Sequence, residues 1–545
     1  MKKYSELCPA DARPDLRFDL PGLDYPARMN VAEVLLEGAM EAGRGGRIAY
    51  FHRDEAITYR ELRASVHRHA AALRALGVQP GDRVVVRIAD TPALVYVLLA
   101  AHAVGAVPIP TYVQLRAEDL VYRLEDSGAR FAVASARQLD EMEAAVAATP
   151  GVTLALADAK ADGRFASLPA LLPEAEAEVG YYDSHAEELT LIVYTSGSTG
   201  RPKGACHCHR DLIASADSYW KHCVDPSGHD VIGGPPSIPF SLGYGLFVIY
   251  PARFGSAAVL EPDKSVEASL AAVERHGVTI FAAVVSYYRL MAAGLDRGRI
   301  GSLRRTMTGG EPLSPETESL WREKSGMVLE QFIGTTEMFH CFITASEPGK
   351  PARSGTMGRA SPGYEVAVLD ADTLAPVADG ERGLLAVRGC TGTVYWRDES
   401  RQRELVRDGW NVFPDVVIRD SEGWFRYVAR HDEMIVSAGY NISPIEVETA
   451  LLGHEAVLDC ACVPAPDPAG VRDAIVKAYV VAAPGHAAGG ELAARLQAHV
   501  KATAPPYMYP RAIDFLDALP KTPNGKVLRS ELRTRAAAGT SPDVS

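Results

Sequence analysis

The sequence predicts an α/β fold: a large N-terminal domain, made of two doubly wound α/β subdomains and a β-rich subdomain, and then a small α+β C-terminal domain. Three observations support this prediction. The chain has 545 residues, which is too long for a single hydrophobic core. Its first half alternates helix and strand patterns, and after Gly355 the pattern changes to short strands broken by polar turns.

The first β-α-β unit can be followed residue by residue. Thr58 and Glu61 have the spacing of a capping box, so a helix is expected to begin there. Apolar residues then recur at helical spacing, and Gly77 is placed to end the helix. A buried strand, a buried helix and a core strand are expected next, at Arg83–Ile88, Pro92–Val104 and Val107–Ile109.

The remaining chain continues this pattern and then leaves it. The later strands of the α/β part are expected near Leu191–Tyr194, Ala257–Leu260, Thr279–Val285 and Val328–Phe332. The strands Glu365–Leu369 and Gly383–Val387 predict the β-rich subdomain. After the charged stretch Ala429–Glu433, the last segment has its own helices and strands, at Pro444–Leu452, Val476–Val481 and Glu491–Thr503. We therefore expect one domain over residues 1–431 and another over residues 432–545.

Composition excludes several classes of protein. Lys and Arg number 56 against 69 Asp and Glu, which gives a net charge of −13 and disfavours a general nucleic-acid binder. The N-terminus lacks the apolar core of a secretory signal. The uncharged stretch Pro92–Pro110 contains His102 and a turn, so a buried helix fits better than a membrane span. The 8 cysteines have no framework spacing, so a reduced, cytoplasmic protein is expected.

The run Tyr194-Thr-Ser-Gly-Ser-Thr-Gly-Arg-Pro-Lys203 carries the strongest chemical signal. Glycine lets the backbone approach a phosphate closely, the hydroxyls can donate hydrogen bonds, and Lys203 supplies positive charge. The run is not a Walker A loop, because Pro202 precedes the lysine and Gly204 follows it. The residues expected to bind phosphate are Thr195, Ser196, Gly197, Ser198, Thr199, Gly200 and Lys203.

This run resembles the phosphate-binding loop of the adenylate-forming superfamily, which includes acyl-CoA and aryl-CoA synthetases, adenylation domains of peptide synthetases and beetle luciferases. The resemblance extends from about Tyr25 to about Arg533, with further motifs in the family's order. It implies a ligase that uses ATP, Mg²⁺ and coenzyme A, with a mobile C-terminal domain that rotates about a hinge. Mg²⁺ prefers hard oxygen ligands and usually lies between a carboxylate and phosphates.

The resemblance assigns the other nucleotide residues. Gly309-Gly-Glu-Pro-Leu313 and Gln331-Phe-Ile-Gly-Thr-Thr-Glu337 are similar to the segments around adenine and the α-phosphate, with Glu337 as the Mg²⁺ residue. Asp415 and Arg430 match the two ribose contacts, although Phe413-Pro414 replaces the family's Thr-Gly. The nucleotide set is thereby completed by Gly310, Glu311, Pro312, Ile333, Gly334, Thr335, Thr336, Asp415 and Arg430.

The resemblance also assigns the catalytic and thioester residues. Leu519-Pro-Lys-Thr-Pro-Asn-Gly-Lys526 matches the C-terminal motif of the family, so Lys526 is expected to be the catalytic lysine and to contact the nucleotide. Asp432 matches the hinge, and Thr336 and Glu337 complete the catalytic set. The segment from Gly439 resembles the loop that forms the thioester, with Gly439, Tyr440 and Asn441 on the CoA side.

The acid is expected to be aromatic. Pro239-Phe-Ser-Leu-Gly-Tyr-Gly245 resembles the pocket segment of aryl-CoA ligases, and His340 matches a pocket histidine of benzoate and 2-aminobenzoate ligases. The pocket residues are then Phe240, Ser241, Leu242, Gly243, Thr308, Gly309 and His340. The nearest resemblance is to 2-aminobenzoate (anthranilate)–CoA ligases, so 2-aminobenzoate is the expected acid, with Ser241 or His340 accepting a hydrogen bond from its amine.

Several alternatives stay open at this point. Benzoate or 2-hydroxybenzoate could be the acid, and a carrier-protein phosphopantetheine supplied in trans could replace CoA. A nucleotide-binding pseudoenzyme and a luciferase-like monooxygenase are weaker alternatives, and a homodimer is neither required nor excluded. Cys206-His-Cys-His209 suggests zinc, but alternating residues of an extended segment point to opposite faces and cannot all reach one ion.

Overall fold

The first layer of the molecule is a parallel sheet. The structure is a computed structural model, which describes residues 2–159, 164–173, 178–195, 201–339, 341–348, 352–437, 440–468, 474–521 and 527–538. Five described strands pair in parallel in the order β4-β3-β5-β6-β7. Their bounds are β3 (Arg83–Arg87), β4 (Val107–Pro110), β5 (Phe131–Ala134), β6 (Thr153–Leu156) and β7 (Ala166–Ser167).

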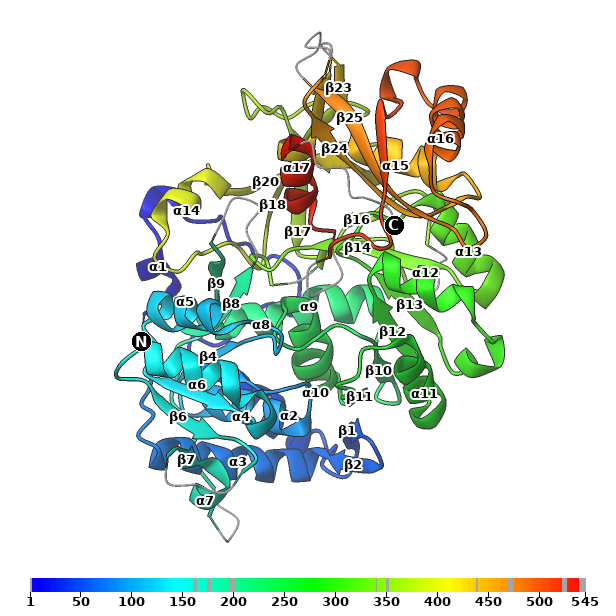
Figure 1. Cartoon of the computed structure of the whole chain (residues 1–545). Coiled ribbons are helices and arrows are strands. Elements are labelled where there is room, and N and C mark those ends of the chain that lie inside the picture. Colours follow the sequence, from blue (N-terminus) through cyan, green and yellow to red (C-terminus); the bar gives the residue numbers. More distant parts are fainter. Residues whose placement is uncertain are drawn as a thin grey trace.

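Helices cover this sheet as the β-α-β prediction requires (Figure 1). The helices α4 (Pro92–Ala103), α5 (Ala117–Ser127) and α6 (Leu139–Ala148) contact it, while α2 (Val31–Glu41) and α3 (Tyr59–Ala75) pack on α4. The capping box of α3 is confirmed, because Glu61 accepts the Thr58 N–H at 2.8 Å and Thr58 accepts the Glu61 N–H at 3.3 Å. The apolar helix α4 is buried around its circumference, and among the described residues no helix is long and apolar enough to cross a membrane.

The second sheet has nine described strands in the order β16-β15-β14-β13-β12-β10-β11-β1-β2. Its centre is parallel, and antiparallel pairs lie at both edges. The bounds are β1 (Ile48–His52), β2 (Glu55–Thr58), β10 (Val231–Gly233), β11 (Ala257–Val259), β12 (Ile280–Ala283), β13 (Arg305–Thr308), β14 (Leu329–Gly334), β15 (Cys341–Thr344) and β16 (Arg359–Ala360). The helices of this part include α11 (Val266–His276), α12 (Val285–Ala293) and α13 (Pro315–Ser325). The predicted strand Thr279–Val285 is shorter than expected, because Val285 already begins α12.

A two-stranded hairpin lies beside β4 of the first sheet, between two hydrophobic cores. The strand β8 (Leu189–Thr195) pairs with β9 (Lys203–Cys208) in antiparallel register, and α8 (His209–Ser215) follows. Leu191 and Val193 belong to one hydrophobic core, whereas Ile192 and Tyr194 belong to another. The apolar run of β8 was expected to continue the parallel pattern, but the structure places it in a hairpin whose two faces are both buried.

The β-rich part is antiparallel, as predicted from its short strands and polar turns. It contains β17 (Tyr364–Leu369), β18 (Arg382–Gly389), β19 (Val406–Arg407), β20 (Trp410–Arg419) and β21 (Phe425–Arg430), with α14 (Glu399–Leu405) between β18 and β19. The strand β20 includes Phe413 and Pro414, and its register with β18 shifts between Val412 and Val416, so the ladder is irregular at these two residues.

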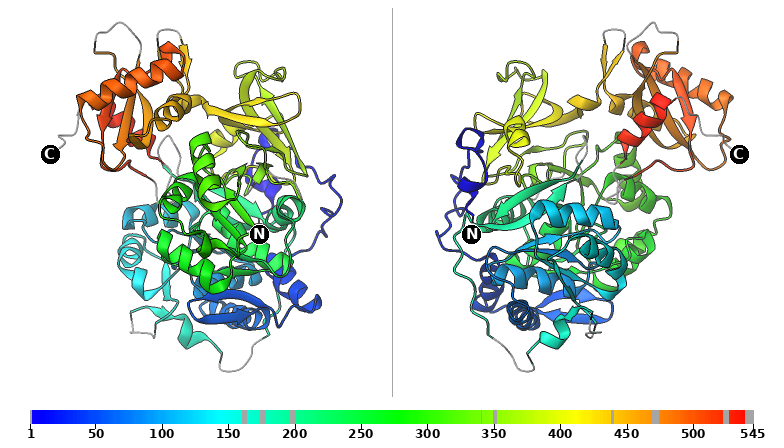
Figure 2. Two further views of the ribbon diagram at one scale, coloured as in Figure 1. Left: turned by 90° about the vertical axis from the view of Figure 1, so that its right-hand side faces the viewer. Right: turned by 60° about the vertical axis from the view of Figure 1, so that its left-hand side comes forward.

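The C-terminal part has its own hydrophobic cores. A hairpin of β22 (Ile435–Ser437) and β23 (Tyr440–Ile442) leads into the sheet β24-β25-β26, with bounds Val457–Ala465, Ile475–Ala482 and Ala512–Phe515. The helices α15 (Pro444–Leu452), α16 (Gly490–Thr503) and α17 (Arg529–Ala538) pack around it. Two core clusters consist of residues between Ile435 and Ala536. Figure 2 shows this part, in orange and red, at one end of the molecule.

Buried histidines lie inside the N-terminal core. His102 on α4 is fully buried and shares hydrogen bonds with the hydroxyls of Thr190 (2.8 Å) and Tyr244 (2.6 Å). His209 accepts the Val31 N–H at 3.1 Å. Burial lowers the pKa of His102 to about 3, so its imidazole stays neutral in the folded chain.

His102→Gln is expected to make stability less dependent on pH. Because the pKa of His102 is lowered by folding, its contribution is complete above 6.5 and is lost as the pH falls from there toward about 3. In that range the free energy of unfolding falls by up to about 1.4 kcal/mol for each unit by which the pH is lowered, for one such histidine. Denaturant titrations at several pH values test this. The exposed His229, changed to Gln, is the control, and equal slopes for wild type and His102→Gln would contradict the prediction.

Candidate active site

The predicted phosphate loop connects the two strands of the hairpin. Thr195 ends β8, Lys203 begins β9, and the two residues are paired in the ladder. Residues Ser196–Gly200 lie outside the described residues. The base of the loop is held by Tyr122, whose hydroxyl donates to the Pro202 carbonyl at 2.9 Å. A Cβ atom on Gly204 would lie 2.9 Å from the Ile192 side chain, so the glycine is required for close packing of the hairpin.

Lys203 points toward an aromatic ring that the sequence did not indicate. Its ammonium lies over the ring of Tyr395, 5.6 Å from the centroid. Burial, followed by the positive charge of Arg401, lowers the pKa of Lys203, and the charge of Glu337 partly opposes this. Lys203 is therefore a half-buried cation with a carboxylate in its surroundings.

Glu337 follows β14 in a tight turn. The Thr335 hydroxyl accepts the Met338 N–H at 3.2 Å, and the Thr336 carbonyl accepts the Phe339 N–H at 3.0 Å. Tyr395 donates its hydroxyl to Glu337 Oε1 at 2.8 Å. The structure therefore brings the predicted residues Lys203 and Glu337 together around one tyrosine. Within Val394-Tyr-Trp396 no pattern of residue types distinguishes this tyrosine from a core aromatic.

The two predicted ribose residues are neighbours on adjacent strands. Asp415 on β20 is paired with Arg430 on β21, and the Tyr427 hydroxyl donates to Asp415 Oδ1 at 3.1 Å. Phe413, which replaces a smaller residue of the family motif, stacks on Phe342 with ring centroids 5.7 Å apart. Its ring is buried in the core and anchors β20 next to Asp415.

The segment from Gly309 lies at the end of β13. Glu311 accepts hydrogen bonds from the backbone N–H and the hydroxyl of Ser286, at 2.7 and 3.1 Å. Gly310 has a φ of 82°, and a Cβ on Gly309 would lie 2.5 Å from the Phe332 ring. The exposed Pro312 and the half-buried Ile333 and Gly334 flank this segment and the end of β14.

The predicted acyl-pocket residues surround the short helix α9 (Ser241–Tyr244). Phe240 packs against Tyr112 with ring centroids 5.5 Å apart, Ser241 is buried, and Leu242 packs against the large core. A Cβ on Gly243 would lie 2.0 Å from the Ser237 carbonyl, so only glycine fits there. Thr308 is fully buried, and its hydroxyl has no hydrogen-bond partner within the described part of the chain. His340 lies outside the described residues.

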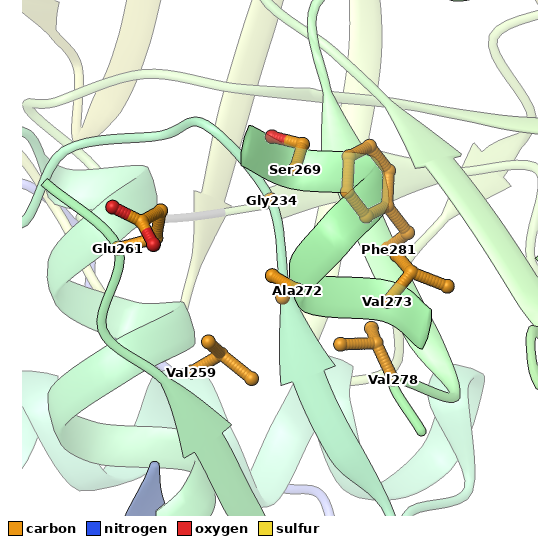
Figure 3. A pocket seen from close by; sticks show the side chains of 9 residues that line it. Gly234, Val259, Glu261, Ser269, Ala272, Val273, Val278 and Phe281 are labelled. Carbon is orange, nitrogen blue, oxygen red and sulfur yellow. The ribbon is translucent and has the colours of Figure 1, made fainter. Parts of the chain in front are cut away.

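A small pocket elsewhere in the second sheet is not this site. It lies among β10, β11, α11 and β12, and its lining includes Val259, Glu261, Ser269 and Phe281 (Figure 3). Its volume of about 10 Å³ is that of a single water molecule. An aromatic acid does not fit there, and none of the predicted site residues lines it.

Along β9 the side chains of Cys206, His207 and Cys208 alternate between two sides of the strand, as predicted. Cys206 and Cys208 lie in one core cluster with Tyr194, whereas the ring of His207 packs edge-on against Phe339, with centroids 5.2 Å apart. Burial lowers the pKa of His207 to about 3. His207 thereby supports the turn that carries Thr336 and Glu337.

The predicted hinge and thioester segments follow β21 along the chain. Arg430 donates two hydrogen bonds to the exposed Asp432, at 2.9 and 3.1 Å. Tyr440 stacks on Tyr507 with centroids 4.3 Å apart, and Asn441 is paired with Val436 in the hairpin. Gly439 and Lys526 lie outside the described residues.

The C-terminal part contacts α12 through Asp459, which lies beside the chain that precedes Lys526. Lys521 forms an ion pair with Asp459 at 3.0 Å, and Asp459 also pairs with Arg289 of α12 at 3.4 Å. Glu311 lies within electrostatic reach of Lys521. An isolated antiparallel β-bridge pairs Lys521 with Val527, so the two ends of the predicted lysine motif lie next to each other. Glu311 places them close to the Gly309–Glu311 segment.

Comparison with known proteins decides the family. A model described as AMP-binding enzyme matches residues 38–396, and a model of the AMP-binding enzyme C-terminal domain matches residues 446–526. The chain belongs to the AMP-binding enzyme family.

Relatives within the AMP-binding enzyme family match almost the whole chain. The benzoate–CoA ligase of Thauera aromatica is 35% identical over 94% of this chain and 97% of its own. The structure of a benzoate CoA ligase from Burkholderia xenovorans LB400 superposes with a TM-score of 0.84 at 30% identity, over 93% of this chain and 100% of its own. The anthranilate CoA ligase AuaEII, solved with anthranoyl-AMP, has a TM-score of 0.88 at 27% identity, over 94% of this chain and 98% of its own.

This AMP-binding enzyme is an AMP-forming acid–thiol ligase, which uses ATP, Mg²⁺ and CoA. The donor set fits Mg²⁺: Glu337 offers a hard carboxylate oxygen while Tyr395 holds the other. No cluster of three metal-ligating side chains occurs in the part of the chain that is described, as expected where ATP phosphates supply most ligands. Bound there, Mg²⁺ would neutralise charge on the phosphates.

A largely buried arginine, whose side chain is 15% exposed, connects three segments of the C-terminal domain. Arg529 pairs with Glu448 of α15 through two hydrogen bonds, one of them 2.8 Å long, and with Glu433 beside the predicted hinge at 3.3 Å. It also donates to the Cys462 carbonyl of β24 at 3.0 Å. No pattern in the sequence indicates this role, because an arginine in a charged C-terminal helix usually faces solvent.

Arg529→Met is expected to destabilise the C-terminal domain by about 3–5 kcal/mol, because two carboxylates are left in the interior without their cation. Calorimetric unfolding measures this change. The exposed ion pair of Arg535 with Glu531 provides the control, since Arg535→Met should cost about 1 kcal/mol or less. Equal small losses for both variants would show that the Arg529 cluster is not structural.

Proposed function

We propose that the protein is an aryl-CoA ligase that activates 2-aminobenzoate as acyl-AMP and transfers it to CoA. The assignment to aryl-CoA ligases is supported by the similarity to benzoate and anthranilate CoA ligases over more than nine-tenths of the chain. The proposal for the ortho amine rests on two buried hydroxyls, Ser241 and Thr308, at the predicted pocket. A buried acceptor without a partner favours a substrate that brings a donor.

The first half-reaction makes the carboxylate reactive. The carboxylate oxygen attacks the α-phosphorus of ATP, the bond to the pyrophosphate oxygen breaks, and a mixed anhydride with AMP results. Lys203, Thr336 and Lys526 are proposed to meet the charge that develops on the phosphoryl oxygens. Lys526 bridges the carboxylate and the phosphate, which lowers their repulsion and orients the attack. Asp415 and Arg430 hold the ribose.

The second half-reaction uses a thiol. The CoA thiolate attacks the acyl carbon, and the bond to the AMP oxygen breaks. We propose that residues 432–545 act as a lid that rotates about Asp432, which withdraws Lys526 and brings Gly439, Tyr440 and Asn441 to the site. Two observations support this division: residues from Ile435 on have their own cores, and the contact of Asp459 with Arg289 is an ion pair rather than apolar packing.

Two neighbouring functions keep the adenylation chemistry. Benzoate or 2-hydroxybenzoate would serve as the acid if the pocket hydroxyls do not select an amine. A carrier-protein phosphopantetheine could take the place of CoA, and a homodimer is compatible with either function. A nucleotide-binding pseudoenzyme is disfavoured by the arrangement of Lys203 and Glu337 around Tyr395.

ATP–pyrophosphate exchange with 2-aminobenzoate, 2-hydroxybenzoate, benzoate and octanoate tests the substrate. The rate is expected to be highest with 2-aminobenzoate, and Thr308→Val should reduce kcat/KM for this acid by about tenfold, as expected from losing one hydrogen bond in a buried site. With benzoate as the control acid the same variant should change little. Faster exchange with octanoate than with any aryl acid would overturn the aryl assignment. If no acid supports exchange, the result would favour the nucleotide-binding pseudoenzyme instead.

Lys526→Ala is expected to separate the two half-reactions. Adenylation should fall by about a thousandfold, because a charge-stabilising group is lost at the transition state. Thioester formation from supplied 2-aminobenzoyl-AMP should be nearly unchanged. Rapid-quench assays of each half-reaction measure both rates, with Lys501→Ala, a change of an exposed lysine on α16, as the control. An equal loss in both half-reactions would contradict the role of Lys526.

A further inference from the structure

Tyr395 lies where two separate parts of the proposed ATP site meet. Its hydroxyl donates to Glu337 Oε1 at 2.8 Å, and the ammonium of Lys203 lies 5.6 Å from the centre of its ring. The tyrosine is 3% exposed, so both contacts are removed from bulk water. Within the described part of the chain no hydrogen bond reaches the other carboxylate oxygen of Glu337.

The backbone around Tyr395 is fixed on both sides. Trp396 donates its N–H to the Gly204 carbonyl, and Cys206 donates its N–H to the Val394 carbonyl, both at 2.8 Å. Tyr395 donates its own N–H to the buried side chain of Gln402 at 2.9 Å. Residues 394–396 therefore run along β9, the strand that follows the phosphate loop. Protein groups alone make the hydrogen bonds that hold this segment.

We propose that Tyr395 is a positioning residue for the adenylation step, whose hydroxyl orients the Glu337 carboxylate toward the metal of Mg·ATP and whose ring places Lys203. The inference rests on the proposed function of this site. A phenol suits the task, because it donates one hydrogen bond to a carboxylate and leaves the second oxygen for a cation. The electron-rich face of the same ring attracts the ammonium of Lys203.

The charge state of Tyr395 agrees with this role. Burial and the neighbouring Glu337 carboxylate raise the pKa of the phenol well above its ordinary value. A phenol can only donate to a carboxylate, so the hydrogen bond to Glu337 has one direction. Tyrosine thus orients Glu337 without adding a second negative charge beside Lys203.

The role predicts a specific pattern of loss. Tyr395→Phe removes the hydroxyl and keeps the ring, so the placement of Glu337 should suffer and that of Lys203 should not. The concentration of Mg²⁺ needed for half-maximal adenylation should rise about tenfold or more, as expected for a lost hydrogen bond to a charged group. KM for the acid, and thioester formation from supplied acyl-AMP, should be unchanged.

A binding measurement gives a readout that does not depend on turnover. Mn²⁺ binding is followed by electron paramagnetic resonance in the presence of a non-hydrolysable α,β-methylene analogue of ATP. Tyr395→Phe should weaken Mn²⁺ binding by about the same factor as it raises the Mg²⁺ requirement, about tenfold. Tyr395→Leu, which also removes the ring, should in addition weaken binding of the analogue in the absence of metal, since Lys203 loses its support.

Tyr50→Phe is the matched control. Tyr50 is also buried, its hydroxyl donates to the Phe247 carbonyl at 2.7 Å, and neither residue belongs to the predicted nucleotide or metal set. It should lower thermal stability by an amount similar to Tyr395→Phe and leave the metal requirement unchanged. If Tyr395→Phe lowers stability but neither the Mg²⁺ requirement nor Mn²⁺ binding changes, the tyrosine is only structural and the inference is wrong. Wild-type enzyme that adenylates no acid would instead refute the proposed function.

Discussion

The packing of the β8–β9 hairpin between two hydrophobic cores is the constraint on which the site depends. Leu191 and Val193 face one core, and Ile192 and Tyr194 face the other, so the hairpin cannot shift without exposing apolar side chains on one side. The two ends of the loop that joins its strands, Thr195 and Lys203, are thereby held at a fixed place. The β-rich part adds the segment 394–396 along β9, which brings an aromatic residue from a distant part of the sequence onto Lys203.

Electrostatics at this place differ from those of the molecule as a whole. The chain carries a net charge of −13, which would repel a polyphosphate from most of the surface. Lys203 and Arg430 are half-buried cations whose neighbours are carboxylates, and Arg401 adds a further positive charge near Lys203. The carboxylates of Glu337 and Asp415 each accept a hydrogen bond from a tyrosine hydroxyl, which orients them without neutralising them. At the proposed site, a nucleotide would therefore bind to a few oriented charged side chains rather than to a generally basic surface.

The sequence allowed much of this to be predicted, for reasons that can be named. The capping box at Thr58, the helix ending before Gly77 and the alternation in β9 all depend on neighbours within a few residues, and the structure confirms them. The hairpin partner of β8 could not be predicted, because an apolar run does not reveal whether its neighbour is parallel or antiparallel. Tyr395 and Arg529 were missed for a related reason: their carboxylate partners, Glu337 and Glu448, lie 58 and 81 residues away. The roles of Ser196–Gly200, His340, Gly439 and Lys526 remain predictions from motifs.

The contact between the C-terminal domain and α12 has a consequence for engineering. Arg289 of α12 pairs with Asp459 across it, while their sequence neighbours Leu290 and Leu458 stay 61% and 41% exposed. A single ion pair adds little stability, whereas apolar side chains packed across the contact would resist separation. Redesigning this contact so that apolar side chains pack across it would raise the melting temperature of one arrangement of the two domains. If the domains part during turnover, as proposed, the same change would slow that step, and heat tolerance and catalytic speed would compete at this contact.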